Sequence, residues 1–523
     1  MIPAEASAGP GARLHPWALG GALVLAAALR LVSLGVTEVE WWDSTVYLTE
    51  ARRIAEAIPW APPYETHRAP LLPWLGALSF SAGLGARGIY LANVLLSVGT
   101  VGLTYAAGAL LFGRAAGLAS AVLMAVSWES LFFTQRVLTE TPALFFWLLA
   151  LVAWLLAVVR GRTTWFLLLG PAVALAFLSH FRAGAILLAF ALHFVAAGKW
   201  GLLRRREVLA SAALALLGFG AYAAFSAARW GSPFGFLRSY QLARLRSLGP
   251  ERLVVFARYL GYLPSYLGSF LFALLLGALA VGLARALRRA GQSSAPEAAP
   301  ERAGVLLAGL VLVPLALPSL FESFHHRLGV LCLPGLFLLL GAAIAGAAER
   351  IAPRSAAVAR AAFAGALAIA AAQQLGTADD WLHAEGSSYL SVKDAALWVG
   401  RRSPAGAAVV TTSWPQVNYY AERPTAGVPG TAAGFEALVR ERRAPFLVLS
   451  DYERTPPWVA PFLEENAARL PLVFSAGDVP GLQTRVYDLS ALVDGPGGGE
   501  LGAVGPRRDR PRPLAVGVAV GAS

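Results

Sequence analysis

Long runs of apolar residues dominate the pattern along this chain. A helix that crosses a bilayer core needs about 20 such residues, and about eleven stretches of roughly that length recur. They are residues 16–34, 88–112, 115–133, 142–159, 165–178, 183–197, 208–228, 263–284, 304–320, 328–348 and 358–375. The pattern predicts an all-α polytopic membrane domain with about eleven transmembrane helices.

The segment between the first two spans, residues 36–87, has a different pattern. Residues 44–58 mix apolar positions with Glu and Arg, which is typical of an amphipathic helix lying on a membrane surface. A proline-rich turn follows, and the apolar stretch that ends near Leu84 is too short to cross. We expect it to form a second juxtamembrane or re-entrant helix in the first external loop.

Beyond Leu375 the pattern changes to that of a small water-soluble module. Strand-like runs at 407–412, 446–450 and 472–475 alternate with helix-like segments at 391–402 and 457–470, which predicts a compact α/β domain. The predicted organisation is a cytoplasmic N-terminus (1–14), a membrane domain (15–375) with a cytoplasmic linker (286–303), an external α/β domain (376–490) and a disordered basic tail (491–523).

Composition excludes an ordinary soluble enzyme. With 57% hydrophobic residues, 14% charged residues and a mean hydropathy of +0.59, the chain has too little polar surface for one. The single cysteine, Cys332, excludes an internal disulfide framework. No glycine-rich nucleotide fingerprint or Walker motif is visible. We therefore expect membrane lipids, and no nucleic acid, among the partners.

The positions of Lys and Arg predict the orientation, because cytoplasmic loops carry most of them. On one side these residues are Arg114, Arg160, Arg162, Lys199, Arg204, Arg205, Arg206, Arg285, Arg288, Arg289, Arg350 and Arg354. With the first span kept as a signal anchor in the plasma (bacterial inner) membrane, the other side is external. It would hold Asp43, Glu140, residues 229–258, residues 325–327 and everything after Leu375.

Two carboxylates at one membrane surface indicate chemistry, because charged groups near hydrocarbon are costly. Asp43 follows the first span and Glu140 precedes the fourth. Arginines at the same surface, among them Arg136, Arg182 and Arg327, are unexpected there, because Lys and Arg are normally concentrated in cytoplasmic loops. Their planar guanidinium groups suit phosphate oxygens. Contact with lipid headgroups is the alternative for any one of them.

Structural roles also fit several of these residues. Asp43 could cap the surface helix, and Glu140 could favour the dipole of the helix that follows it. Arg136 and Glu140 are four residues apart and could pair with each other. His325 and His326, with Glu322, invite a metal-site hypothesis, although hydrogen bonding to substrate fits adjacent histidines better. We predict no metal site, and a divalent cation stays open as a cofactor.

Three short motifs in order carry a family resemblance. Asp43 follows the first span with Tyr47 four residues later, Arg68-Ala-Pro-Leu-Leu-Pro-Trp74 follows in the same loop, and Arg136 and Glu140 follow the third span. This arrangement resembles the GT-C glycosyltransferases, in particular the protein O-mannosyltransferase and aminoarabinose transferase (ArnT) branch. The resemblance covers roughly residues 15–350 and the layout of the C-terminal domain.

The resemblance implies a hexosyl- or pentosyltransferase that moves a sugar, with inversion, from a polyprenyl-phosphate donor to an external acceptor, which could be a protein, a lipid or a polysaccharide. A membrane-surface carboxylate suits the base that takes the acceptor proton, and arginines suit the leaving phosphate. The predicted site comprises Asp43 as base, Glu140 as a second catalytic residue, Arg68, Arg136, Arg182 and Arg327 for the lipid phosphate, and Tyr47, His67, His325 and His326 for other substrate contacts.

Two other classes remain open from the sequence. A transporter or flippase could use outward arginines to guide an anion or a lipid-linked substrate, with the acids coupling protons. A noncatalytic scaffold for envelope assembly is the other. Transporters usually show repeats and polar breaks near the bilayer midplane, whereas this chain gathers its ionisable groups at one surface.

Overall fold

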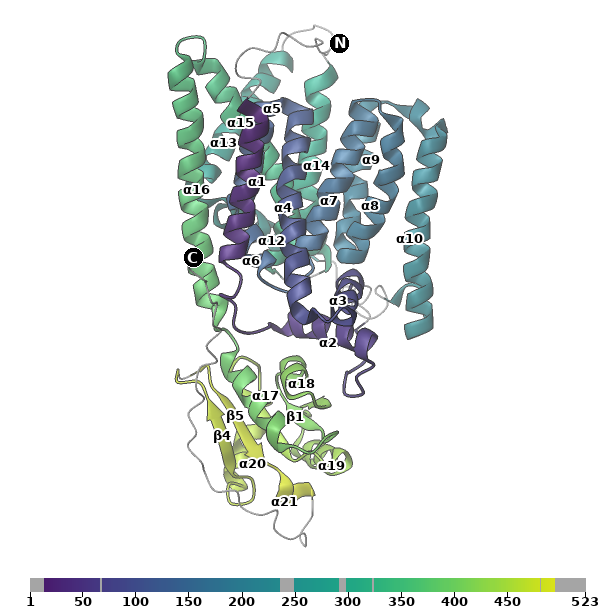
Figure 1. The fold of residues 1–523 in the computed structure, drawn as a ribbon, viewed down its shortest axis with the longest axis vertical. Coiled ribbons are helices and arrows are strands. Elements are labelled where there is room, and N and C mark those ends of the chain that lie inside the picture. The colour runs from purple at the N-terminus through teal and green to yellow at the C-terminus, as the bar shows by residue number, and fades with distance from the viewer. Residues whose placement is uncertain are drawn as a thin grey trace, which may run out of the picture.

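The structure is a computed structural model that describes residues 14–65, 68–235, 249–290, 298–321, 324–479 and 481–493. It consists of a tall bundle of helices and a smaller domain that contains a sheet. The smaller domain lies at one end of the bundle (Figure 1). The all-α membrane domain and the α/β C-terminal domain predicted from the sequence are both confirmed.

The bundle is built from helices, most of which stand roughly side by side along its long axis (Figure 1). They are α1 (Leu14–Val32), α4 (Gly85–Phe112), α5 (Arg114–Val126), α6 (Trp128–Thr134), α7 (Glu140–Trp154), α8 (Phe166–Ser179), α9 (Ile186–Ala197), α10 (Arg206–Trp230), α12 (Glu251–Gly261), α13 (Leu263–Ala290), α14 (Ala298–Phe321), α15 (Leu333–Ile351) and α16 (Ala356–Gly386). Short helical segments flank some of them. They are the π-helix η2 (Leu155–Val159) and the 3₁₀-helices η3 (Thr163–Trp165), η4 (Phe181–Ala185), η5 (Trp200–Arg204) and η7 (His326–Cys332).

Seven helices in the described residues are long and apolar enough to cross a membrane, and α5 with α6 makes an eighth if that bent pair is one span. The pair bends by 51° at Ser127, whose side chain accepts a hydrogen bond from the backbone N–H of Ser130 and caps α6. Helices α1, α8 and α9 are apolar but shorter. Ten of the eleven predicted stretches each coincide with one helix, and residues 115–133 coincide with the bent pair of α5 and α6, so the chain is a multi-pass membrane protein.

Helices α2 (Trp42–Glu56) and α3 (Leu71–Ser81) lie at the end of the bundle nearest the C-terminal domain (Figure 1). Both helices predicted in the first loop are therefore present, but the setting of α2 corrects the expectation of a free surface helix. All eight residues from 44 to 51 are buried. The reason is that α3 packs against α2 and the C-terminal helix α18 (Trp414–Ala421) covers it further.

The C-terminal domain holds one mixed sheet of five strands in the order β2-β1-β3-β5-β4. Its strands are β1 (Val409–Thr411), β2 (Thr425–Gly427), β3 (Phe446–Ser450), β4 (Leu472–Ala476) and β5 (Thr484–Asp488), and its further helices are α17 (Leu390–Arg402), α19 (Ala432–Arg442), α20 (Val459–Glu465) and α21 (Ser490–Val493). Strand β1 runs parallel to β2 and β3, whereas β5 runs antiparallel to β3 and β4. The sequence pattern missed β2, which has three residues, and β5, whose Thr, Arg and Asp lack a strand-like apolar run.

Two predicted segments fall largely outside the described residues. The N-terminal segment 1–14 is described only at Leu14, and the tail 491–523 only as far as Val493. Of the predicted linker 286–303, residues 291–297 also lie outside the described part, and its flanking residues belong to α13, which continues to Ala290, and to α14, which begins at Ala298.

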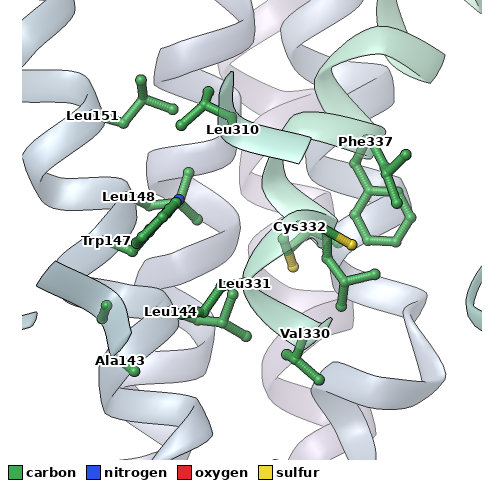
Figure 2. Packing of buried hydrophobic residues seen from close by; sticks show 14 of the residues in the cluster. Ala143, Leu144, Trp147, Leu148, Leu151, Leu310, Val330, Leu331, Cys332 and Phe337 are labelled. Atoms are coloured by element: carbon green, nitrogen blue, oxygen red, sulfur yellow. The ribbon is translucent and has the colours of Figure 1, made fainter. Parts of the chain in front are cut away.

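Buried side chains of α7 and η7 hold the two elements together (Figure 2). Leu144, Trp147 and Leu151 of α7 belong to the same buried cluster as Leu331 and Cys332 of η7. Each buried large apolar side chain contributes about 1.5–3 kcal/mol relative to exposure to water, although inside a bilayer close packing matters more than that transfer. The cluster fixes the start of α7 and the start of η7, which both carry polar residues of the site.

Candidate functional site

A cavity of about 280 Å³ opens at the end of the bundle, where α2 lies. Its lining comes from the first loop, the start of α7, the break between α8 and α9, and η7. The lining residues are Asp43, Tyr47, Arg68, Ala69, Leu138, Thr139, Glu140, His180, Phe181, Arg182, His325, Arg327 and Leu328. The cavity is therefore both polar and assembled from segments almost 300 residues apart.

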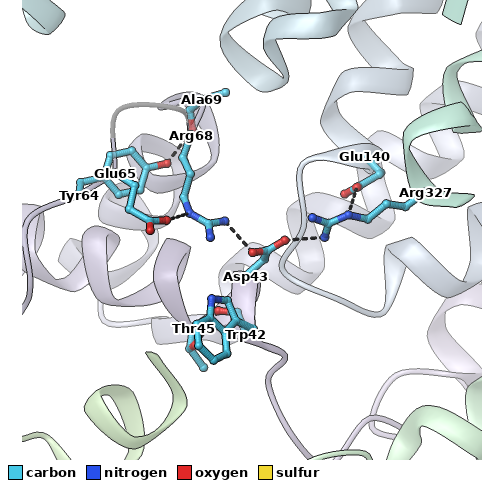
Figure 3. Close-up of polar contacts among 9 residues, drawn as sticks. All are labelled: Trp42, Asp43, Thr45, Tyr64, Glu65, Arg68, Ala69, Glu140 and Arg327. Atoms are coloured by element: carbon cyan, nitrogen blue, oxygen red, sulfur yellow. Dashed lines mark hydrogen bonds and ion pairs between the residues drawn. The ribbon is translucent and has the colours of Figure 1, made fainter. Parts of the chain in front are cut away.

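Asp43 lies between two arginines in this cavity (Figure 3). Its Oδ1 accepts a hydrogen bond from Arg68 Nη1 at 2.7 Å, and its Oδ2 pairs with Arg327 Nη1 at 2.5 Å. The distance to Arg68 is that of a charge-assisted hydrogen bond, and the contact with Arg327 is shorter still. Asp43 lies in the first turn of α2, but the N-cap residue is Trp41 and no side chain caps the helix. The capping role considered for Asp43 is thus not the one its carboxylate performs.

Arg68 is nearly buried, with 8% of its surface exposed, and it is held from several directions. Its Nε pairs with Glu65, and its guanidinium lies 5.5 Å from the centre of the Tyr47 ring. The hydroxyl of Tyr64 donates to the carbonyl oxygen of Ala69 at 2.8 Å and so closes the loop that carries Arg68 (Figure 3). This bracing presents the guanidinium to the cavity in one orientation.

Glu140, the first residue of α7, approaches the second arginine. Its Oε1 lies 3.9 Å from Arg327 Nε. Its other oxygen, Oε2, is buried and has no hydrogen-bond partner among the described residues. Because α7 and η7 pack against each other below this point, Glu140 and Arg327 are held at a fixed separation.

The arginines decide the charge state of Asp43. Burial alone would raise the pKa of the Asp43 carboxyl group, but Arg327 and Arg68 together hold that pKa well below its usual value. Burial works against the charge of Arg68 as well, yet Asp43 and its neighbours raise the pKa of Arg68 well above normal. Asp43 is thus a firmly ionised carboxylate, and a weak proton acceptor for as long as both arginines face it.

Seven of the predicted site residues meet in the cavity. They are Asp43, Tyr47, Arg68, Glu140, Arg182, His325 and Arg327. The carboxylates and arginines were placed on one side of the membrane by counting spans, and the structure brings them to one end of the bundle (Figure 1). His67 was also predicted and lies outside the described residues.

Arg136 was predicted to bind phosphate but is absent from the cavity lining. Its guanidinium is stacked 3.7 Å from the centre of the Phe132 ring and 4.3 Å from that of Trp41, and burial lowers its pKa to about 10. The alternative of an ion pair with Glu140 does not form either. Helix α6 ends at Thr134 and α7 begins at Glu140, so the four-residue spacing does not lie on one helix.

His326 does not line the cavity either. Its ring packs among aromatic rings, with centroids 5.8 Å from Tyr262, 5.8 Å from Trp381 and 6.5 Å from Trp128. Adjacent His325 does line the cavity, so the two histidines diverge. Across the described part of the chain, no three His, Cys, Asp or Glu side chains form a group that could hold a metal ion, and Glu322 lies outside that part.

Sequence reasoning missed two ionisable residues of the site. Glu65 pairs with Arg68, and His180 lines the cavity between α8 and η4. Neither belongs to a recognisable motif. The sequence did contain a signal for His180. It lies between the apolar stretches 165–178 and 183–197, at the membrane side predicted for Asp43, and two residues before Arg182.

Comparison with known proteins gives this architecture a family context. The family model described as "Dolichyl-phosphate-mannose-protein mannosyltransferase" matches residues 67–223. Structural similarity extends over 92% of this chain and 99% of the ArnT chain from Cupriavidus metallidurans in the apo state, with a TM-score of 0.66 at 16% identity. The chain has the GT-C fold.

Two further solved structures agree with this assignment. ArnT from Cupriavidus metallidurans bound to undecaprenyl phosphate matches with a TM-score of 0.65 at 15% identity, over 92% of this chain and 99% of that chain. The oligosaccharyltransferase AglB from Archaeoglobus fulgidus, in complex with an inhibitory peptide and a dolichol-phosphate, matches with a TM-score of 0.60 at 14% identity, over 90% and 74%. No curated protein sequence matches significantly. The resemblance to the mannosyltransferase and ArnT branch, expected from the sequence, is confirmed.

Proposed function

We propose that this protein is an inverting membrane glycosyltransferase that moves a sugar from a polyprenyl-phosphate donor to an acceptor hydroxyl or amine at the external face of the plasma membrane. The observation that carries the proposal is Asp43, a carboxylate held between Arg68 and Arg327 in a membrane-surface cavity. Similar structures contain undecaprenyl phosphate or a dolichol-phosphate. Those ligands support a lipid-phosphate donor for this chain.

The reaction needs one base and one site for a leaving phosphate. The acceptor atom attacks the anomeric carbon, and the bond between that carbon and the phosphate oxygen breaks. Its electron pair leaves with the lipid phosphate, and the acceptor proton passes to the Asp43 carboxylate. Attack opposite the leaving group inverts the anomeric centre. General base catalysis of this kind contributes typically 10²–10⁴-fold.

Donor binding would convert Asp43 from an arginine counter-ion into a base. The donor phosphate is an anion and would compete with Asp43 for the donors of Arg68 and Arg327. As the arginines turn to phosphate, the pKa of Asp43 rises towards its ordinary range, because their charges are what lower it. Glu140, 3.9 Å from Arg327, would keep that arginine directed at the cavity. The base would thereby become active only when the donor is present.

The distribution of charge supports the external face. The cavity and the C-terminal domain share one end of the bundle (Figure 1). The basic loops begin near Arg114, Arg160, Lys199 and Arg350, at the opposite ends of the helices. Cytoplasmic loops are the ones enriched in Lys and Arg, so the site would face outward.

The test is transfer in reconstituted vesicles from a panel of radiolabelled polyprenyl-phosphate sugars to membrane acceptors. We expect transfer by the wild type and a loss of at least 10²-fold in Asp43→Asn, with Asp380→Asn as the matched control, because Asp380 is exposed on α16 far along the chain from the site. Equal transfer by both variants would remove Asp43 from catalysis. Movement of intact lipid-linked sugar across the vesicle membrane without transfer would favour a transporter, and neither activity would favour a scaffold.

A further inference from the structure

We propose that His180 is a neutral hydrogen-bond donor that binds a hydroxyl group of the sugar carried by the lipid donor. The inference rests on the proposed function and assigns a sugar-recognising residue to the same cavity. His180 lines this cavity together with Asp43, Arg182 and Arg327. No sequence motif pointed to it.

The backbone holds His180 firmly at the break between α8 and η4. Its own N–H donates to the carbonyl oxygen of Ala176 at 3.0 Å, and its carbonyl oxygen accepts from the N–H of Ala183 at 2.7 Å. The residue is extended, with φ −155° and ψ 117°, and serves as the N-cap of η4. The imidazole therefore leaves the backbone at a point anchored on both sides.

A hydrogen bond assigns the tautomer of the ring. Nδ1 accepts from the backbone N–H of Arg182 at 3.3 Å. A neutral imidazole has one acceptor and one donor nitrogen, so acceptance at Nδ1 places the proton on Nε2. Within the described residues, Nε2 has no hydrogen-bond partner. The ring thus has a single unused donor, and it lines the cavity.

The surrounding charges keep the ring neutral. Burial, followed by the charges of Arg182 and Arg327, lowers the pKa of His180 to about 3, against the opposing charge of Asp43. A neutral donor adds nothing to the positive charge that the arginines offer to phosphate. It suits an uncharged hydroxyl, where one well-placed hydrogen bond discriminates between sugars that have and lack the group.

Two substitutions test the roles of Nδ1 and Nε2 separately. His180→Gln places an amide N–H near the position of Nε2 but loses the Nδ1 acceptor. His180→Asn keeps an acceptor near Nδ1 for the N–H of Arg182 but cannot reach the position of Nε2. The measurement is the Kd of each purified protein in nanodiscs for undecaprenyl phosphate alone and for the panel of undecaprenyl-phosphate sugars.

We expect His180→Asn to bind the sugar-bearing lipid several-fold to about tenfold more weakly, which is the usual size for one neutral hydrogen bond. Its Kd for undecaprenyl phosphate alone should equal that of the wild type, and His180→Gln should lose less than His180→Asn on the sugar-bearing lipid. If His180→Asn weakens the binding of both ligands equally, or weakens neither, the role assigned to His180 is wrong, but the proposed function is unaffected. If the wild type binds no member of the panel, the proposed function falls with it.

Discussion

Replacing Asp43 by Asn should lower transfer by at least about 10²-fold and at the same time tighten the binding of undecaprenyl phosphate. The carboxylate occupies the donors of Arg68 and Arg327 that a phosphate would need. Without its charge, the Nη1 groups of both arginines become available to the cavity, although Glu65 stays paired with Arg68 and Glu140 stays near Arg327. A residue that only maintained the shape of the site would give the opposite result, because its loss would weaken ligand binding.

The expected gain follows from the strength of the two ion pairs. Opposite unit charges about 4 Å apart attract by about 4 kcal/mol at an effective dielectric constant of about 20. Arg327 is about a third exposed, so solvent screening reduces its share, whereas Arg68 is nearly buried. Charged hydrogen bonds contribute a net 1.5–3 kcal/mol or so. Removing this competition should tighten binding by about 1.4–2.7 kcal/mol, or roughly 10- to 100-fold in Kd.

The assay is the Kd for radiolabelled undecaprenyl phosphate in nanodiscs, for wild type, Asp43→Asn and the control Asp380→Asn. The control should match the wild type. The gain in Asp43→Asn should shrink with rising salt, since the added attraction is electrostatic. An unchanged or higher Kd in a folded Asp43→Asn protein would refute the competition between carboxylate and phosphate on which the proposed mechanism depends.

Two further predictions concern the second arginine and the packing of the bundle. Arg327→Gln should lower kcat by about 10²–10³, as expected for loss of one preorganised donor. It should also move the acid limb of the kcat/KM profile to higher pH, because the base acts as a carboxylate and the pKa of Asp43 is then less strongly lowered; an unmoved limb would contradict this. Gly341→Ala should destabilise the bundle by about 1–3 kcal/mol, because a Cβ there would lie 2.1 Å from Ser120 Oγ. Gly346→Ala, on the same helix with nothing within 4 Å, should leave the melting temperature unchanged or higher.

Much of the fold could be predicted from the sequence, because bilayer hydrocarbon imposes long apolar helices whatever their neighbours. Every predicted stretch became a helix, and counting spans put the carboxylates and the C-terminal domain at one end. The α/β domain was predictable from three strand-like runs. Strands β2 and β5 were not, because each is short and has no apolar run, and pairing with β1, β3 and β4 is what selects them.

The partners within the site were decided only by the tertiary structure. From the sequence, Arg136 was expected to bind phosphate and could also have paired with Glu140. The break between α6 and α7 instead places its guanidinium against the Phe132 ring, and Arg327 lies near Glu140. Burial of α2 likewise depends on a domain some 370 residues away, as the contact between Arg52 and Glu422 illustrates. Hydrophobic patterning determines which segments enter the membrane, because each helix satisfies its own backbone there. Which side chains meet depends on how the helices pack and where they break, and that information is distributed over the whole chain.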